Sequence, residues 1–161
     1  MAGVDLADQK GCGRLEGLID VEDRGQQGVA RRWLDLVTQG RIEELCAMTA
    51  PTWTMHGGPP ALPPGPNGIR ALFGTFGRIE QTWTAEDVIA EGDKVVVRAT
   101  NSCLQDSFLG IPGRGRRQVF SATFIFRVVG GQVLETWRAA DDLGRVLQLG
   151  ARIAPAEPPV P

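Results

Sequence analysis

The chain has 161 residues, of which 42% are hydrophobic and 22% are charged, and this composition is typical of one globular domain. The formal net charge of -2 argues against nucleic acid or an anionic membrane surface as a partner. No apolar run approaches the roughly 18 residues of a membrane span, and the N-terminus lacks the apolar core of a signal peptide.

The first half of the chain is predicted to be mainly helical. Residues 1–24 are rich in glycine and acidic side chains, and we expect an N-terminal extension that is partly disordered. Residues 25–153 are expected to form the single domain. Apolar residues at helical spacing predict three helices, at residues 26–40, 42–50 and 67–77, with a short extended run at residues 52–56.

The second half is predicted to consist of strands. Period-two patterns place four consecutive antiparallel strands at residues 80–90, 94–104, 118–128 and 132–139, and a short helix follows at residues 142–149. The tail, residues 154–161, has four prolines in eight residues and is expected to be disordered. Helices followed by strands predict an α+β fold, with helices over one face of a curved antiparallel sheet and a pocket between the layers.

The last two strands form the most informative stretch. Gly130-Gly131 predicts a tight hairpin turn, because both residues can adopt positive φ. Pairing across a two-residue turn sets Glu135 opposite Phe126 and Trp137 opposite Phe124. These four side chains are therefore expected on one face, with a carboxylate among aromatic rings.

Two further carboxylates end this hairpin. Asp141 has the same strand parity as Trp137, so we expect it to point into the pocket. There an apolar environment would raise its pKa and make it a better general base. Asp142 is then expected to cap the final helix in solvent. The alternative is that Asp141 is itself the helix cap.

Two other residues are candidates for polar roles in the pocket. His56 is the only histidine, and it could hydrogen-bond a carbonyl and stabilise a developing alkoxide. Arg98 lies in mid-strand with Thr100 on its face, and a buried guanidinium there could pair with Asp141 or Glu135. Both have simpler alternatives, namely a strand-end histidine bonded to backbone and an outward arginine in a dimer interface.

The apolar wall of the pocket is predicted from aromatic residues, which could equally be ordinary core. They are Trp137, Phe120, Phe124, Phe126 and Phe73. A single histidine and three cysteines without metal-like spacing argue against a metal site, and the cysteines are expected to be reduced thiols in a cytoplasmic protein. No nucleotide-binding loop is present, so we expect no cofactor.

Five segments, taken together, resemble the SnoaL-like polyketide cyclases of the nuclear transport factor-like superfamily. In chain order they are MHGGPPALPPGPNGIRALF, VIAEGDKVVVRAT, FLGIPGRGRR, FIFRVVGGQVLETWRAAD and VLQLG, within residues 26–151. The resemblance implies a cone-shaped curved sheet closed by N-terminal helices, an apolar cavity, no cofactor, and a homodimer or homotetramer formed through the outer face of the sheet.

The resemblance also implies residue roles. The spacing E-x-W-x-x-x-D places the family's acid/base aspartate at Asp141, and His56 matches a polar position at the end of the first strand. A histidine common in the family is absent, with Gln105 nearest to its place. The two carboxylates of the epoxide-hydrolase branch are replaced by Thr100 and Ala139, which argues against epoxide hydrolysis by the usual route.

The sequence therefore predicts a cofactor-independent enzyme of natural-product biosynthesis, such as antibiotic biosynthesis, that closes a polyketide-like substrate by an aldol reaction. Isomerisation, dehydration, epoxide opening or ring-forming addition in the same pocket are alternatives, as is a non-catalytic binding or accessory protein. An outward apolar patch made of Val95, Val97, Ile125 and Leu134 is expected to hold at least a homodimer together.

Overall fold

A computed structural model describes residues 12–155 of the chain, with side chains from residue 24 onward. Its helices are α1 (Cys12–Gln39), α2 (Ile42–Ala47), α3 (Pro66–Gly74) and α4 (Asp142–Gln148). Its strands are β1 (Thr49–His56), β2 (Ile79–Glu91), β3 (Lys94–Gln105), β4 (Ser107–Phe108), β5 (Ile111–Pro112), β6 (Gln118–Val129) and β7 (Gln132–Ala140). The expectations for residues 1–11 and 156–161 lie outside the described residues.

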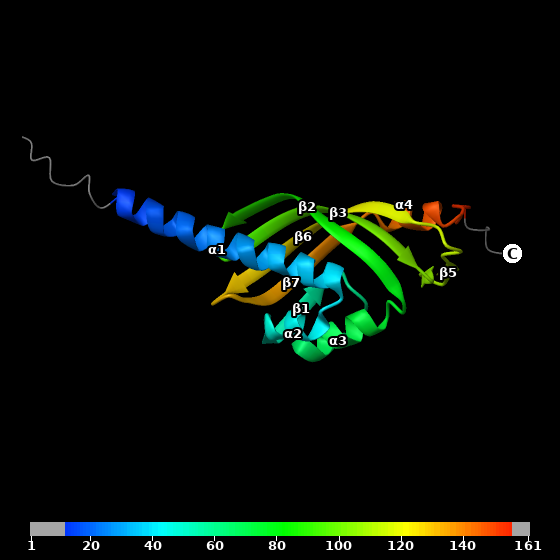
Figure 1. Cartoon of the computed structure of the whole chain (residues 1–161), viewed down its shortest axis with the longest axis horizontal. Coiled ribbons are helices and arrows are strands. Elements are labelled where there is room, and N and C mark those ends of the chain that lie inside the picture. The colour runs from blue at the N-terminus through cyan, green and yellow to red at the C-terminus, as the bar shows by residue number, and fades with distance from the viewer. Residues whose placement is uncertain (1–11, 156–161) are drawn as a thin grey trace, which may run out of the picture.

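Three helices form the layer that covers the sheet. Helix α1 begins at Cys12, earlier than the predicted start at residue 26, and its N-terminal end extends beyond the body of the molecule (Figure 1). It ends before Gly40, whose φ of 66° is accessible to glycine at little cost. Helix α3 begins with a proline at its first position, where the missing N–H costs no helical hydrogen bond.

The strands form one curved sheet in the order β1-β7-β6-β3-β2, beside a small β4-β5 ribbon. The pairs β2–β3, β3–β6 and β6–β7 are antiparallel, whereas β1 runs parallel to β7, so the sheet is mixed. Helix α1 packs across the concave side of the sheet, and α2 and α3 lie near β1 (Figure 1). The predicted α+β architecture, helices over one face of a curved sheet, is confirmed.

The β6–β7 hairpin differs from its predicted register. Gly130 and Gly131 have φ of 58° and 77°, as the tight turn requires, and Val128 pairs with Val133 as expected. Beyond that pair Leu134 has no partner in β6, so the strand contains a bulge. Glu135 therefore pairs with Arg127, and Trp137 pairs with Ile125. The predicted pairs Glu135–Phe126 and Trp137–Phe124 are wrong, because one extra residue exchanges the two faces of the strand.

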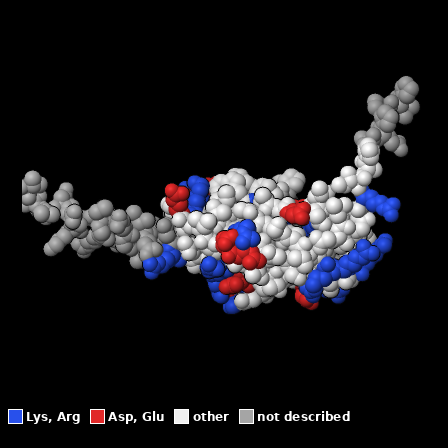
Figure 2. All heavy atoms as spheres, turned by 90° about the horizontal axis from the view of Figure 1, so that it is seen from above, with Lys and Arg blue, Asp and Glu red and all other residues white. Residues whose placement is uncertain are grey.

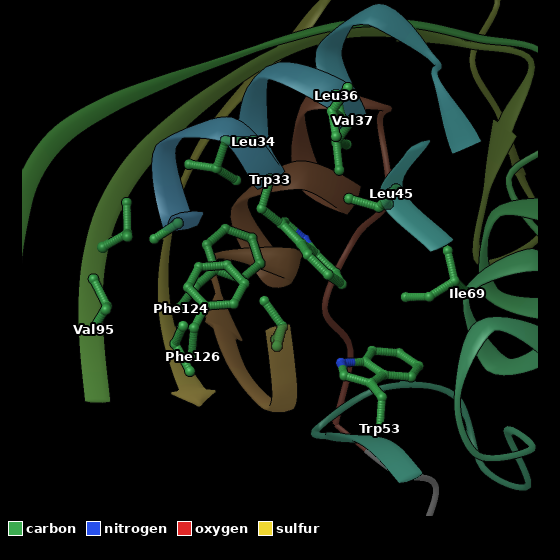
Figure 3. Close-up of a cluster of buried hydrophobic side chains, with 14 of the residues drawn as sticks. Trp33, Leu34, Leu36, Val37, Leu45, Trp53, Ile69, Val95, Phe124 and Phe126 are labelled. Carbon is green, nitrogen blue, oxygen red and sulfur yellow. The ribbon is translucent and has the colours of Figure 1, made fainter. Parts of the chain in front are cut away.

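The core lies between α1 and the concave face of the sheet (Figure 3). Trp33 of α1 is close to Phe126 of β6, with ring centroids 5.7 Å apart, and to Trp53 of β1 at 6.3 Å. Phe124 and Phe126 stack side by side at 5.8 Å. Phe126 is fully buried in this core. The aromatic side chains of β6 thus join the helical layer to the sheet.

The outer face of the sheet is formed by different residues from those predicted. Val95 and Val97 are fully buried on the concave side, so the expected outward patch is wrong at these positions. Register instead places Ile89, Val96, Ile125 and Trp137 in one row across four strands of the outer face. Figure 2 shows acidic and basic side chains mixed near the middle of one face of the molecule. No helix in the described part of the chain is long and apolar enough to cross a membrane.

Candidate functional site

A cavity of about 440 Å³ lies between the helices and the concave face of the sheet. Its wall is mostly aromatic and aliphatic, which favours a small apolar ligand. The apolar lining includes Trp33, Trp53, Met55, Leu72, Phe73, Phe76, Ile79, Trp83, Phe108, Leu109, Phe120 and Phe124. The polar lining consists of Gln81, Gln105, Thr136, Arg138, Asp142 and Arg145.

Four of the predicted site residues line this cavity: Phe73, Phe120, Phe124 and Gln105. Trp83 also contributes to the wall, by edge-to-face contact with Phe120 and Phe124 at centroid distances of 5.7 Å and 5.1 Å. Such geometry is favourable between aromatic rings. The resulting wall offers flat rings to a planar ligand.

Asp141 does not line the cavity. Its side chain is exposed and accepts a hydrogen bond from Gly144 N at 2.8 Å, so it is the N-cap of α4. A Cβ at Gly144 would lie too close to Asp141 Oδ2, so a larger residue there would require the carboxylate to shift. The expectation that Asp141 points inward is wrong, because the bulge at Leu134 reverses the parity on which it depended.

His56, Glu135 and Trp137 meet on the outer face of the sheet. His56 stacks on Trp137 with ring centroids 4.6 Å apart, and its Nε2 lies 3.1 Å from Glu135 Oε2. Arg127 donates to Glu135 at 2.7 Å and to Asp93 at 2.8 Å. These Arg127 hydrogen bonds lower the pKa of both carboxyl groups. The cluster is separate from the cavity lining.

Arg98 and Thr100 also lie on the outer face. Arg98 donates to Asp87 at 2.6 Å, and both side chains are more than half exposed. Thr100 donates to Glu86 at 2.8 Å. Neither residue faces the cavity, so the predicted contact between Arg98 and an inward carboxylate is not formed.

Asp142 is the carboxylate that lines the cavity, the only one among the described residues. Arg138 of β7 donates two hydrogen bonds to its carboxylate, at 2.8 Å and 2.7 Å. The hydrogen bonds from Arg138 lower the pKa of Asp142, and burial opposes this effect only in part. The group is therefore ionised at neutral pH, in contrast to the raised pKa expected for a pocket base.

Arg145 is the second arginine of the cavity and is almost completely buried, with 6% of its surface exposed. The central carbon of its guanidinium lies over two aromatic rings, 3.7 Å from the centroid of Phe108 and 4.7 Å from that of Phe120. Burial lowers the pKa of Arg145, although an arginine remains protonated in proteins. Among the described residues the cavity wall thus holds two arginines and one carboxylate, which gives a net charge of one positive unit.

Sequence reasoning missed Asp142, Arg138 and Arg145 as site residues. The spacing Arg138-x-x-x-Asp142 was a detectable signal, because a strand end followed by a helix start brings such residues together. Nothing in the local sequence marks Arg145, which stands between exposed leucines in a short helix. Within the described residues, no group of three or more His, Cys, Asp or Glu side chains could hold a metal ion.

Comparisons with known proteins agree with this architecture. A family model described as a SnoaL-like domain matches residues 30–136. The structure of TsrD from Streptomyces laurentii is similar, with 30% identity, a TM-score of 0.71, and coverage of 80% of this chain and 97% of that chain.

Two more distant structures share the fold. One is a SnoaL-like polyketide cyclase from Agrobacterium tumefaciens, with 20% identity, a TM-score of 0.65, and coverage of 78% of this chain and 98% of that chain. The other is an LEH-like epoxide hydrolase from M. tuberculosis, with 16% identity, a TM-score of 0.65, and coverage of 80% and 91%. A search of curated proteins found no match.

Proposed function

Because the chain belongs to the SnoaL-like domain family, we propose that it is an enzyme that closes a ring in a polyketide-like small molecule by acid–base chemistry without a cofactor. The observation that carries this proposal is the Asp142 carboxylate, ionised and set in the wall of an apolar cavity. It is the acid/base residue of the proposed reaction, in place of Asp141.

The lowered pKa of Asp142 limits the chemistry that it can support. A weak base removes protons at a useful rate only from an acidic carbon, such as a methylene between two carbonyl groups. Asp142 takes that proton, and the resulting enolate carbon attacks a second carbonyl carbon of the same molecule. A C–C bond forms as the C=O π bond opens, and Asp142 returns its proton to the alkoxide. The sequence of steps is a net isomerisation.

Arg138 has two parts in this mechanism. Its paired hydrogen bonds fix the orientation of the Asp142 carboxylate, which matters because small misplacements of a catalytic group are costly. Once Asp142 is protonated, Arg138 loses its anionic partner and becomes available to a developing alkoxide. The pair therefore provides both the base and a stabilising charge for the product oxygen.

The two hydrogen bonds between Arg138 and Asp142 also fit an alternative function, that of a non-catalytic binding protein. Since both carboxylate oxygens already accept hydrogen bonds, the pair could serve only to neutralise charge in a non-catalytic binding protein. In that case Asp142 would affect ligand affinity or stability and not the breaking of a C–H bond.

Deuterium exchange separates these functions without knowledge of the natural substrate. We would follow loss of the C2 proton of ethyl benzoylacetate by NMR in mildly acidic D2O, after subtracting the uncatalysed rate. Asp142→Asn should lower the catalysed rate about 10²–10⁴-fold, the usual contribution of a general base. The matched control Asp141→Asn should change it by less than about twofold, because Asn caps a helix as well as Asp. Wild-type exchange in Asp142→Asn would refute the assignment.

We also propose that two copies associate through the outer face of the sheet. The cross-strand row of Ile89, Val96, Ile125 and Trp137 supports this, and Ile89 is 64% exposed in the single chain. Sedimentation at about 10 μM should give the mass of a dimer or larger assembly. A monomeric mass at that concentration would exclude it.

A further inference from the structure

Arg145 is a buried cation in the cavity wall that makes no salt bridge with any described carboxylate. Only 6% of the Arg145 surface is exposed. Asp142, the one carboxylate among the described residues that line the cavity, forms its salt bridge with Arg138 and not with Arg145. A buried charge without a partner costs free energy, so such a group usually meets an opposite charge in the functional state.

The donor groups of Arg145 show where that partner would bind. Nε donates to Gln118 Oε1 at 2.9 Å, while Nη2 donates to Gln105 Oε1 and, at 3.4 Å, to Cys103 Sγ. Nη1 has no hydrogen-bond partner among the described residues. The fully buried side-chain polar atoms that lack a partner are Gln26 Oε1 and Asn101 Oδ1, so Nη1 is not fully buried and remains accessible. Nη1 is thus the nitrogen that remains for a ligand in the cavity.

The surroundings of Arg145 hold it rigidly. Phe108 and Phe120 lie against the guanidinium at 3.7 Å and 4.7 Å, and three neutral acceptors fix its other edge. A guanidinium held in this way loses little side-chain entropy when it binds an anion. These hydrogen-bond partners carry no formal charge, and Asp142 attracts the guanidinium only through space, without a hydrogen bond to it.

We infer that Arg145 is the anchor for a carboxylate on the substrate, whose flat apolar body lies against Trp83 and Phe124. This inference rests on the proposed function for the identity of the cavity as the substrate site, and it adds the class of substrate, an organic acid. Asp142 and Arg138 then act on the part of the molecule away from this carboxylate. Arg145 positions the substrate and takes no part in proton transfer.

Calorimetric titration of the full chain with 2-naphthoate and its neutral isostere 2-naphthamide tests the inference. The wild type should bind 2-naphthoate about 10- to 100-fold more tightly, which is the value of one charge-assisted hydrogen bond. This comparison needs no substitution, so it does not depend on the folding of a variant. Equal affinity for the two compounds would overturn the inference.

Variants then assign the preference to Arg145. Arg145→Gln should bring the two affinities within about threefold of each other, because the ligand loses its charged partner. The matched control Arg98→Gln, on the outer face, should keep the wild-type ratio. If Arg145→Gln lowers the melting temperature but retains the ratio, Arg145 is structural and the inference fails.

Asp142→Asn separates this inference from the proposed function. It should retain the preference for 2-naphthoate, since Arg145 is unchanged, while losing deuterium exchange. A protein that keeps the preference but whose exchange does not depend on Asp142 would refute the proposed function and leave the carboxylate anchor in place. Loss of the preference in Asp142→Asn would instead show that Arg145 alone does not provide it.

Discussion

The two faces of the β6–β7 hairpin carry opposite charge balances. On the outer face Arg127 donates hydrogen bonds to two carboxylates, Asp93 and Glu135. Glu135 is also within hydrogen-bond distance of His56. On the inner face one carboxylate, Asp142, stands with two arginines, Arg138 and Arg145. Each charged group of the outer cluster therefore has a partner of opposite charge within the protein, whereas in the cavity two arginines share one carboxylate and a net positive charge remains among the described residues. The same residue types thus support a surface network on one side and a binding site on the other.

The largest expected difference between the faces is in stability. Phe126→Ala should lower the free energy of unfolding by about 3–5 kcal/mol, because it removes a fully buried ring and leaves a cavity. Val119→Ala, at a 53% exposed position of the same strand, should change it by about 0.5 kcal/mol or less. Denaturant unfolding of both variants measures the difference, and similar values would contradict the assignment of the two faces.

The next difference concerns the two ion pairs of the hairpin. Arg138→Gln should lower the rate of deuterium exchange about 10²-fold, because Asp142 loses the two hydrogen bonds that orient it. Arg127→Gln disrupts the outer pair and should leave the rate within about twofold, since that pair lies outside the cavity. A comparable loss in both variants would point to a general effect on folding.

The pH dependence of exchange sharpens the role of Arg138. Its hydrogen bonds place the pKa of Asp142 below the ordinary Asp value of about 3.9, so the base should remain ionised and active down to that pH. The rate should fall only as the pH drops through this lowered pKa. In Arg138→Gln the acid limb of the profile should move to higher pH. An acid limb that stays in place would mean that Arg138 does not control the carboxyl group.

The contribution of the Arg138–Asp142 pair to folding stability should also be lost at low pH. A carboxyl group whose pKa is lowered in the folded state stabilises the fold above its ordinary pKa and loses this contribution as pH falls through the folded value. Circular dichroism in the same buffers therefore provides the control for the rate profile. Exchange that declines while the protein remains folded reports the titration of Asp142.

The smallest effect is expected from His56→Ala on the outer face. An ion pair and a ring stack at a partly exposed site contribute about 1 kcal/mol or less. Deuterium exchange should be unchanged, because His56 does not line the cavity. Thermal unfolding and the exchange assay measure the two quantities. A large loss of exchange would restore His56 as a catalytic candidate.

The sequence by itself determined the long strands of the sheet, the positions of its helices apart from the early start of α1, and one wall of the cavity. Period-two alternation identified the inward aromatic residues of β6, including Phe120 and Phe124, because a strand half-buried against a core requires one apolar face. The Gly130-Gly131 turn followed from the positive φ that such turns need. These features depend on residues near one another in the chain.

Only the tertiary structure decided which carboxylate faces the cavity. Residues 132–141 carry polar and apolar side chains at both parities, so their local pattern fits either orientation of β7. The ladder formed with β6 and β1, including the bulge at Leu134, selects one of them. Likewise α4 exposes Leu143 and Leu147 and buries Arg145, the reverse of what their hydrophobicity predicts. Distant residues of β3 and β6 accept hydrogen bonds from the Nε and Nη2 of Arg145 and so hold it in the wall of the cavity. Pairing with remote strands sets side-chain direction here, and that information is not local to the sequence.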